Sequence, residues 1–442
     1  MSNRMVSVGA RETCFVRDAP VGNERNRNAP AGNVGARYIA PVFCGGRHIC
    51  RPYISVMLGV FYLFFIGILP INAQTDLPER LHPRQVFIER DVDSGGRDRV
   101  IFVDLLTGEE FSVTVAGERY TVLQNSVMYF DSERSQVMLL LPNGTLRPHP
   151  FIQKPESARR IDWIVAADGS RIAWTITEGT PNALVTRTYV ANAADTGTIN
   201  GFSETGHEVF VDAPRDGVRA FPVAFNDNGS RLYMDYQPDA IGDFAPLRQY
   251  AGLFALDLTD SASTPVLLPG EPGCFCGAGI GAGRFVRLAL RDGLSGFDVR
   301  VTDLNAADPA LTTRQIAAIS LVGFTQNGDV LIAPDGARAV YSLAQIRGFG
   351  TAEQSVQMVF ILVDLVNGTQ RTLTQPSGVL YRPIAWTEDS SAILVTTSTG
   401  AAGTGAIGTW KIDVNDGSLR LIASAAYLGT LIPTAAENLT PQ

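Results

Sequence analysis

The chain alternates short apolar runs with polar turn pairs, and two such phrases repeat along it. In the first phrase, an apolar or aromatic residue is followed three and four residues later by a polar pair and then by a hydrophobic run. It occurs as Phe130 with Glu133-Arg134, Val165 with Asp168-Gly169, Phe225 with Asn228-Gly229, Phe324 with Asn327-Gly328 and Trp386 with Asp389-Ser390. In the second phrase, a hydrophobic run ends in an aspartate before a turn, at Asp104, Asp257, Asp364 and Asp413. Two alternating strand–turn phrases over most of a chain are typical of radial or solenoid repeats.

The pattern predicts an all-β region, because the runs are rich in β-branched and aromatic residues and are bounded by Gly, Pro, Asn and Asp. No stretch of helical length has an apolar period of 3.6 residues. The expected strands fall into seven sets: 85–90, 100–105 and 110–115; 126–130, 136–141 and 145–150; 161–165, 171–177, 185–191 and 208–211; 221–225, 231–236, 253–258 and 265–268; 284–290, 297–302 and 313–317; 321–324, 330–332 with 339–343, 357–364 and 369–373; 381–386, 392–397, 408–412 and 419–422.

The two ends of this series complement each other. The first set lacks an innermost strand, whereas an apolar run at 425–432 is left over. A ring closed by pairing the last strand with the first set has no exposed edges between its ends. We therefore predict one β-propeller over residues 84–432, with seven blades preferred over six, and a disordered tail at 433–442.

The turn phrase has a physical basis. Asp-Gly and Asn-Gly pairs supply the positive φ that tight hairpins need. The preceding aromatic or apolar residue is suited to fill the wedge between neighbouring sheets, because one sheet cannot bury both of its faces alone. The repeated Asp104, Asp257, Asp303, Asp364 and Asp413 are expected to cap hairpins rather than to form a catalytic set.

The N-terminal region stands apart from the repeats. Residues 54–69 are uncharged and apolar, follow Arg47 and Arg51, and precede a small-residue site ending at Ala73. Residues 54–73 therefore predict a secretory signal peptide, and an uncleaved signal anchor is the alternative. Either form exports the rest of the chain to the periplasm, the cell surface or the medium. Residues 1–53 predict a disordered extension, unless translation starts at Met57.

Charge restricts the possible partners. The first 53 residues hold eight arginines and three acidic residues, so the remainder holds 28 basic and 41 acidic residues, a net charge of −13. An acidic exported region argues against nucleic acid as a partner, and against a membrane except through an uncleaved N-terminal segment. The expected ligand is a protein, a peptide or a glycan.

The first phrase resembles the repeat of the TolB-like, WD40-like propeller family, whose usual form is Trp-Ser-Pro-Asp-Gly followed by an apolar strand. The copies that carry the resemblance are 166–174 and 225–233, and both lack the Ser-Pro. Each copy departs from the usual form, although together they cover most of 84–432. The resemblance implies a propeller of the kind found in periplasmic interaction proteins or attached to peptidases. It implies no particular ligand.

Candidate chemistry is sparse. His82, His149 and His207 are far apart in sequence. Cys274 and Cys276 allow free thiols or a strained local disulfide. Residues 91–98 alternate oxygen-bearing side chains like a calcium loop, but Phe102 stands where a bidentate Glu is required. Residues 226–229 resemble a sialidase Asp-box without its Ser and Trp, and a turn explains them. We predict no catalytic, cofactor-binding or metal-binding residue.

We therefore expect a binding scaffold that acts through rim loops and a central funnel. The candidate contact loops are 179–182, 237–249, 271–283 and 346–353. The alternatives are an extracellular hydrolase or lyase with carboxylates in the funnel, and a propeller partner of a separate peptidase. Ionisable residues with perturbed pKa values that converge in one pocket would favour the enzyme.

Overall fold

The computed structural model describes residues 82–433 except 91–95, 193–197, 200–201, 204, 240–246, 261–263, 270–274, 292–295, 349–350, 352 and 398–407. These residues belong to one compact unit, Tyr38–Gln442. The extension 1–53, the apolar segment 54–73 and residues 434–442 lie outside the description. In the part that is described, no helix is long and apolar enough to cross a bilayer.

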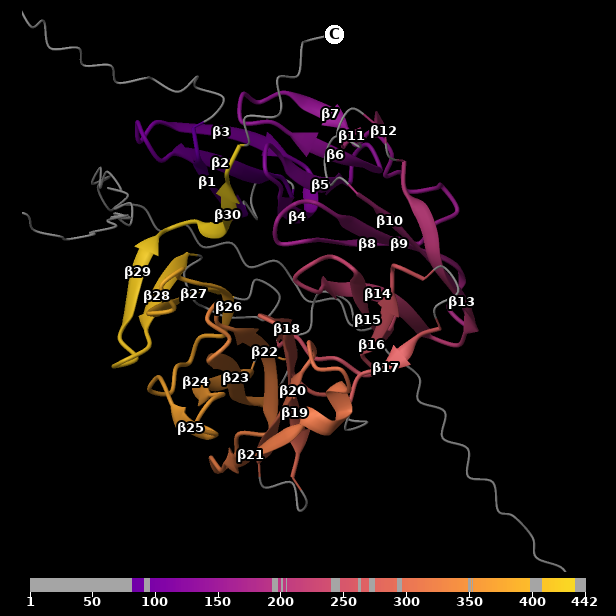
Figure 1. Ribbon diagram of the computed structural model, residues 1–442. Coiled ribbons are helices and arrows are strands. Elements are labelled where there is room, and N and C mark those ends of the chain that lie inside the picture. Colours follow the sequence, from indigo (N-terminus) through magenta and orange to yellow (C-terminus); the bar gives the residue numbers. More distant parts are fainter. Residues whose placement is uncertain are drawn as a thin grey trace, which may run out of the picture. The chain divides into compact units, whose positions relative to one another are not determined.

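Seven four-stranded antiparallel sheets follow one another around a ring (Figure 1). We call them blades 1 to 7 and name the strands of each blade from the centre outwards. Blade 1 is β30 (Ala426–Leu431), β1 (Arg84–Arg90), β2 (Asp98–Asp104) and β3 (Glu110–Val115); blade 2 is β4 (Gly117–Val122), β5 (Val127–Asp131), β6 (Gln136–Leu140) and β7 (Leu146–Pro148); blade 3 is β8 (Arg160–Val165), β9 (Ile172–Thr180), β10 (Ala183–Ala191) and β13 (His207–Arg215); blade 4 is β14 (Val218–Phe225), β15 (Arg231–Pro238), β16 (Phe254–Asp257) and β17 (Val266–Leu267).

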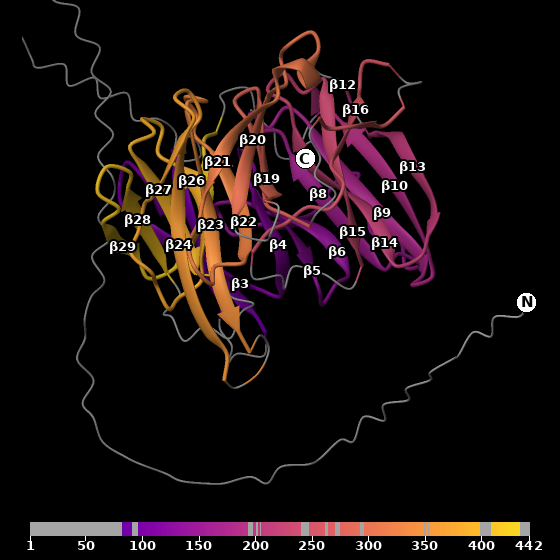
Figure 2. The ribbon, with the colours of Figure 1, turned by 90° about the horizontal axis from the view of Figure 1, so that it is seen from below.

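The remaining blades follow the same order. Blade 5 is β18 (Ala278–Gly281), β19 (Arg284–Leu290), β20 (Phe297–Asp303) and β21 (Arg314–Ile319); blade 6 is β22 (Gln326–Ile332), β23 (Arg338–Arg347), β24 (Ser355–Asp364) and β25 (Thr369–Thr372); blade 7 is β26 (Tyr381–Trp386), β27 (Ala392–Thr397), β28 (Thr409–Asp413) and β29 (Leu419–Ala423). A two-stranded ribbon of β11 (Thr198–Ile199) and β12 (Phe202–Ser203) and the 3₁₀ helix η3 (Pro309–Thr312) complete the described elements. Figure 2 shows the β23–β24 hairpin reaching beyond its neighbours.

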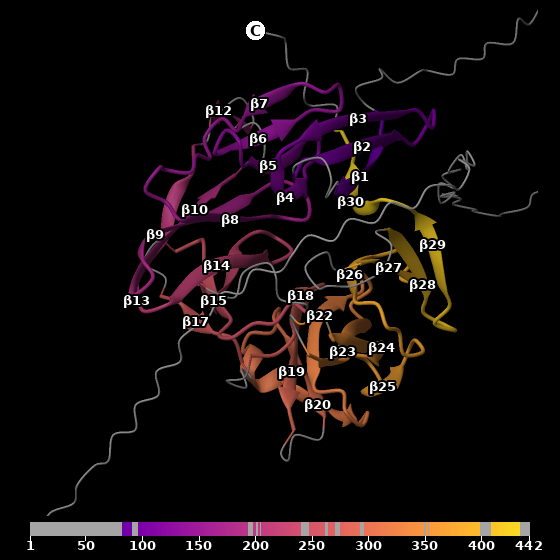
Figure 3. The same ribbon diagram turned by 180° about the vertical axis from the view of Figure 1, so that it is seen from behind.

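The last strand closes the ring, as predicted. β30 pairs with β1 from Arg84↔Leu431 to Ile88↔Ala426 and supplies the innermost strand of blade 1 (Figure 3). The predicted seven blades and the predicted closing strand are therefore confirmed.

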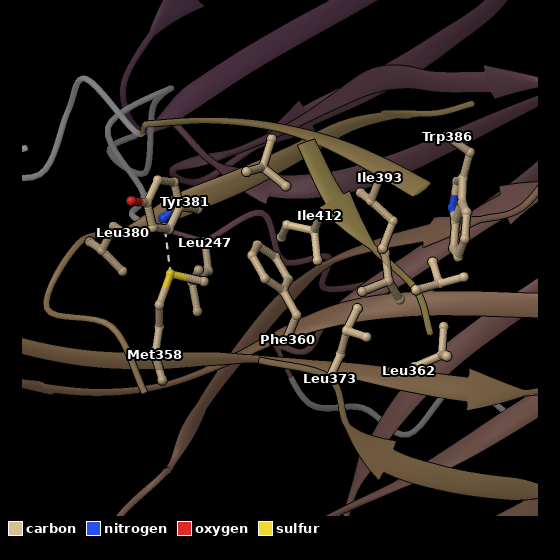
Figure 4. Packing of buried hydrophobic residues seen from close by; sticks show 14 of the residues in the cluster. Leu247, Met358, Phe360, Leu362, Leu373, Leu380, Tyr381, Trp386, Ile393 and Ile412 are labelled. Atoms are coloured by element: carbon tan, nitrogen blue, oxygen red, sulfur yellow. Dashed lines mark hydrogen bonds between the residues drawn. The ribbon is translucent and has the colours of Figure 1, made fainter. Parts of the chain in front are cut away.

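The blades are held together by apolar clusters between their faces. In the cluster between blades 6 and 7, Met358 and Phe360 of β24 pack against side chains from β26, β27 and β28 (Figure 4). The Tyr381 N–H donates to Met358 Sδ at 2.9 Å within this cluster. Trp386, from the turn phrase of blade 7, is buried here, and its indole N–H donates to the Leu331 carbonyl of blade 6 at 3.1 Å. The aromatic of this copy of the phrase therefore fills the wedge, as expected.

The turn phrase is confirmed in three blades, where it joins the first strand to the second. Gly169 N–H donates to the Ala166 carbonyl (2.8 Å), Gly229 N–H to Asn226 (3.0 Å), and Ser390 N–H to Thr387 (2.8 Å). The predicted copy at Phe130 is not equivalent, because its turn joins β5 to β6, the second and third strands of blade 2.

The first strand of blade 6 and the turn after it were predicted too early in the sequence. Residues 321–324 form a turn instead of a strand, and Asn327-Gly328 lie inside β22. The hairpin turn falls instead at 333–336, where Gly336 N–H donates to the Ala333 carbonyl at 2.9 Å. The sequence there, Ala-Pro-Asp-Gly, is closer to the usual repeat than the copies that carried the resemblance.

Two innermost strands escaped prediction. β4 follows β3 after a single residue, Ala116, so no turn residues separate the two blades in sequence. β18 is rich in glycine and was assigned to a contact loop at 271–283. Glycines in β18 and directly before it allow close strand packing: a Cβ on Gly279 would lie 2.6 Å from the Val330 carbonyl oxygen of β22, and one on Gly277 would lie 2.8 Å from Gly328 Cα.

Candidate functional site

A cavity of about 280 Å³ lies among the innermost strands. Its walls come from β4, β8, β14 and β26, from residues 237 and 248–250, and from Phe275. We call this cavity the channel pocket. Its charged lining residues are Arg119, Asp162, Arg248 and Arg382.

Arg119 reaches the pocket from a strained backbone. The pairing of β4 with β5 shifts register between Glu118 and Thr121, which is a β-bulge, and Arg119 adopts φ = 58° there. The left-handed region costs a non-glycine residue roughly 1–2 kcal/mol. Strain of this kind is retained where the surrounding structure uses the altered direction of the side chain.

Asp162 on β8 gathers three guanidinium groups. Arg119 Nη1 forms an ion pair with Asp162 Oδ1 and also donates to the Ile161 carbonyl at 2.9 Å. Arg160 Nε donates to Asp162 Oδ1 at 3.0 Å, and Arg219 Nη1 donates to Asp162 Oδ2 at 2.6 Å. Burial alone would raise the pKa of Asp162, but Arg119, Arg219 and Arg160 outweigh it and lower the pKa to about 2. This carboxylate is therefore an anion at all physiological pH values.

Arg219 on β14 is the most deeply buried member of this group, with 2 % of its surface exposed. Its Nε lies 3.6 Å from Asp239 Oδ1 and makes no hydrogen bond. Its guanidinium carbon stands 5.2 Å from the centre of the Phe221 ring. Burial lowers the pKa of Arg219 in spite of Asp162, so its positive charge is held in a poorly solvated place.

A second carboxylate, Asp329, lies on the other half of the ring. It sits at a β-bulge of β22, between Gly328 and Leu331, and has φ = 50°. Arg382 Nε lies 3.3 Å from Asp329 Oδ1, and the Arg248 backbone N–H donates to the same oxygen at 3.1 Å. Burial raises the pKa of Asp329, and Arg382 and Arg248 oppose that shift. Of the described non-glycine residues with positive φ, Arg119 and Asp329 alone lie inside strands.

Arg248 is held by a segment that crosses from blade 4 to β22. We call residues 247–252 the strap. The buried carboxylate of Asp235 accepts from Ala251 N–H (3.1 Å) and Gly252 N–H (2.7 Å), and Gln249 Nε2 donates to the Asn327 carbonyl at 2.7 Å. A Cβ on Gly328 would lie 2.6 Å from the Arg248 carbonyl oxygen. The strap therefore fits β22 only because residue 328 has no side chain.

Arg287 on β19 anchors the same segment from blade 5. It is fully buried and donates to the carbonyls of Tyr250 (2.9 Å) and Cys276 (3.2 Å). Burial raises the pKa of Asp235 to about 6, although Gly252 and Ala251 N–H and the charge of Arg287 act against that shift. Asp235 is thus a group near the pocket whose protonation changes close to neutral pH.

The rest of the lining mixes aromatic and polar side chains. Trp163, Phe221 and Phe275 form its aromatic part, and Gln237 and Gln249 are among its polar residues. The Trp163 indole N–H donates to Thr121 Oγ1 at 2.9 Å, which joins the walls contributed by β8 and β4. The pocket therefore combines fixed charges with an aromatic wall, the usual composition of a ligand site.

The predicted chemical candidates lie elsewhere. The repeated aspartates cap turns as expected: Asp257 Oδ1, Asp303 Oδ1, Asp364 Oδ1 and Asp413 Oδ1 each accept a backbone N–H from two residues later. His82, His149 and His207 stand beside β1, beside β7 and in β13, in three different blades. Among the described residues, no three His, Cys, Asp or Glu side chains group closely enough to hold a metal ion.

Two other candidates fall partly outside the described residues. Residues 91–95 of the calcium-like loop 91–98 are not described. Asp98 is described, and its carboxylate accepts a hydrogen bond from Tyr120 OH at 2.9 Å. Cys274 also lies outside the described residues, whereas Cys276 is buried and disulfide-bonded.

Of the four predicted contact loops, two supply residues to the channel pocket. Residues 179–182 are wrong as a loop, because β9 runs to Thr180 and β10 begins at Ala183. Residues 271–283 include the inner strand β18. Parts of 237–249 and 346–353 are not described, but the two described ends of 237–249 supply Gln237, Arg248 and Gln249 to the channel pocket.

The arginines of the pocket were missed because they are dispersed in sequence and follow no motif. One signal was present: Arg119, Arg160, Arg219 and Arg382 all lie on the first strand of a blade. Charged residues on strands that face a propeller axis are costly to bury unless they are paired. Detecting them required β4 to be recognised as a strand.

Comparisons with known proteins identify the fold. No family model matches the chain, and no curated protein matches it. A solved prolyl endopeptidase is similar with a TM-score of 0.50 and 12% identity over 80% of this chain and 51% of that one. Puromycin hydrolase is similar with a TM-score of 0.47 and 13% identity over 78% of this chain and 54% of that one, and TolB from Acinetobacter baumannii with 0.35 and 12% over 79% and 82%.

The chain thus spans about half the length of the two hydrolases. At identities this low the likeness concerns the fold alone. It does not establish membership of the TolB-like family. The chain is a seven-bladed β-propeller with a charged pocket on its inner strands.

Proposed function

We propose that the protein is a binding scaffold whose ligand site is the channel pocket. The observation that carries the proposal is Arg119, a charged residue held at φ = 58° in an inner strand and fixed by Asp162 at the pocket wall. Such strain, together with charges from several blades, indicates a preorganised recognition site. Of the two regions predicted to bind, the rim loops and the central funnel, the proposal selects the funnel, where the channel pocket lies.

The protonation properties of the pocket favour binding over proton-transfer catalysis. General acid–base catalysis works best with a pKa near the operating pH. Asp162, with a pKa of about 2, stays ionised, and burial raises the pKa of Tyr120 further above its ordinary value. Perturbed pKa values do converge here, as the hydrolase alternative requires. The shifts of the lining residues Asp162 and Tyr120 point away from neutrality, and the carboxyl groups whose pKa burial raises, those of Asp235 and Asp329, do not line the cavity.

The proposed setting is outside the cytoplasm. It rests on the predicted signal peptide or anchor at 54–73, which lies outside the described residues. A protein, peptide, glycan or smaller ligand remains compatible with this setting.

The test is a thermal-shift screen of the full chain against small molecules of anionic, neutral and cationic classes. Each hit is repeated on Val223→Phe, which places a larger side chain in the pocket lining, and on Val366→Phe, an exposed turn position on blade 6. The proposal expects hits that are lost in Val223→Phe and kept in Val366→Phe.

The same preparations decide between scaffold and hydrolase. Turnover of nitrophenyl esters or peptide anilides that disappears in Val223→Phe but not in Val366→Phe would overturn the proposal. So would a complete set of hits that is indifferent to Val223→Phe.

A further inference from the structure

We infer that the strap is a proton-controlled wall of the channel pocket. It stays in place while the buried carboxyl group of Asp235 is protonated, and it opens when that group ionises. The inference rests on the proposed function for its effect on a ligand, and it adds how binding in the pocket is regulated. Three features of the strap support it: the residues that it gives to the pocket, the groups that hold it, and the carboxyl groups that it buries.

The strap forms part of the pocket wall and belongs to no blade strand. Arg248, Gln249 and Tyr250 line the cavity, and an isolated β-bridge at Tyr250 is the regular pairing within these residues. Arg248 is exposed, and Ala251 and Gly252 are partly exposed. Segments with few regular backbone hydrogen bonds open locally at a lower free energy than the strands of a sheet do. The strap is therefore suited to open while the blades stay folded.

Asp235 on β15 is the group beneath the strap that changes its charge near neutral pH. It is fully buried, and its carboxylate accepts the Gly252 N–H at 2.7 Å and the Ala251 N–H at 3.1 Å. Burial raises its pKa to about 6, and these N–H groups and the charge of Arg287 only partly offset that shift. The ionised group is therefore less favourable under the closed strap than in water, in spite of its hydrogen bonds.

The charged and titratable groups that face Asp235 come from the strap and from blade 5. Burial raises the pKa of Tyr250 above its ordinary 10.0, and Asp235 adds to that shift, so Tyr250 stays neutral at physiological pH. Arg287 of β19 stays charged. β14 places Phe221 opposite Asp235, and β18 has no titratable side chain. In this group the proton exchanged near pH 6 is thus that of Asp235.

The other end of the strap has a similar arrangement. Asp329 Oδ1 accepts the Arg248 N–H at 3.1 Å, and Arg382 Nε of β26 lies 3.3 Å from the same oxygen. Burial raises the pKa of Asp329 in spite of Arg382 and Arg248, and Tyr250 also lies close enough to feel its charge. Opening the strap would hydrate this carboxyl group as well, so its ionisation acts in the same direction as that of Asp235.

The direction of the pH effect follows from these shifts. The pKa of Asp235 is about 6 under the closed strap, and it returns toward the ordinary 3.8 when opening exposes the group to water. The closed strap therefore binds this proton more tightly than the open strap does. Closure is fully favoured below 3.8 and is lost as the pH rises through about 6. Between pH 5 and pH 7.5 the two pKa values increase the opening equilibrium by up to about ten-fold.

Hydrogen exchange measured by mass spectrometry on the full chain tests the opening. The peptide that covers the strap is followed at pH 5 and pH 7.5, and each rate is divided by the intrinsic rate at the same pH. The protection of the Ala251 and Gly252 amides is expected to fall by up to about ten-fold at the higher pH. The fall should be largely absent in Asp235→Asn, whose side chain stays neutral. The turn at Asp364 is the internal control, because the Asn367 N–H donates to this carboxylate and lowers its pKa, so it stays ionised throughout.

Calorimetry measures the consequence for binding. The probe is an uncharged compound from the thermal-shift screen, so that the compound itself does not titrate. Its affinity for the wild type is expected to fall by up to about ten-fold from pH 5 to pH 7.5, whereas Asp235→Asn should keep one affinity at both pH values. The matched control, Asp257→Asn, changes a turn aspartate and should follow the wild type. Thermal unfolding at both pH values checks that each variant is folded.

The outcomes separate this inference from the function on which it rests. Strap protection that does not change with pH, or that falls equally in Asp235→Asn, would overturn the inference. So would an affinity that stays constant while the strap opens, because the strap would then not act as a wall of the binding site. These results leave the proposed function standing. That function fails if no screening compound binds in a way that depends on Val223→Phe, and the regulation of binding then fails with it.

Discussion

The turn aspartates and the channel aspartates hold the same charge in different ways. At Asp257, Asp303 and Asp413, the carboxylate accepts N–H groups two residues later, so the turn itself supplies the partner. Asp162 is held by arginines 43 and 57 residues away in the chain, on other blades. The first arrangement recurs from blade to blade, and the second does not. The repeated turn aspartates therefore serve the fold, whereas the non-repeated Asp162 belongs to the candidate site.

The sharpest test of this contrast applies one substitution to both regions. Asp162→Asn removes the carboxylate that three guanidinium groups share, and the buried Arg219 is among them. Removing one partner of a buried ion pair typically costs about 3–5 kcal/mol of the free energy of unfolding. Asp257→Asn keeps an oxygen that accepts the same N–H, so we expect a change within about 0.5 kcal/mol. Urea unfolding of both variants measures the difference.

The sign of the pH dependence follows from the lowered pKa. The ordinary pKa of an aspartate is 3.8 and that of folded Asp162 is about 2, so its contribution is fully present above 3.8 and is lost as the pH falls toward 2. Equal costs for the two substitutions at neutral pH would contradict the distinction between the regions.

The second test concerns the strap. Asp235 faces Arg287 from β19 and Tyr250 from the strap, and its folded pKa of about 6 lies above the ordinary 3.8. The folded state therefore binds this proton more tightly than the unfolded state does, and stability falls as the pH rises through that window. Relative to Asp235→Asn, the wild-type free energy of unfolding should drop by up to about 3 kcal/mol between about pH 4 and 7. A constant difference across the range would show that the strap is not coupled to this proton.

The third test compares two glycines. Gly328→Ala places a Cβ 2.6 Å from the Arg248 carbonyl oxygen, so the strap must shift, at a cost of about 1–3 kcal/mol. Gly368→Ala, in the turn capped by Asp364, meets nothing closer than 4.0 Å and costs about 1–2 kcal/mol through its φ of +69°.

The stability costs of the two glycine variants overlap, and ligand affinity separates them. Only Gly328→Ala should weaken binding in the channel pocket, because it displaces Arg248. Calorimetry with the same ligand decides this point. Equal affinities in the two variants would show that the strap does not contribute to ligand binding.

The sequence predicted what local chemistry determines. Seven blades, the closing strand at 425–432 and the capping role of Asp257 and Asp413 follow from turn residues and apolar periodicity, and all are observed. The strand predictions were wrong where turn residues and apolar periodicity do not mark the boundaries of a strand. β4 follows β3 without a turn, β18 is glycine-rich because β22 packs closely against it, and Asn327-Gly328 resemble a turn but lie in a bulged strand.

The candidate site could not be predicted by the same means. Arg119 and Arg382 lie on blades 2 and 7, and only ring closure brings both to one pocket. Their partners Asp162 and Asp329 follow no spacing rule, since each pair is long-range. No local pattern encodes such a site, whereas each turn encodes its own cap.

The most direct test of the central claim is a crystal structure of the full chain with a compound that the thermal-shift screen identifies. The account predicts electron density for this compound in the channel pocket, against Arg119 and Val223. Electron density for the compound on the outer loops, with none in the channel pocket, would contradict the account.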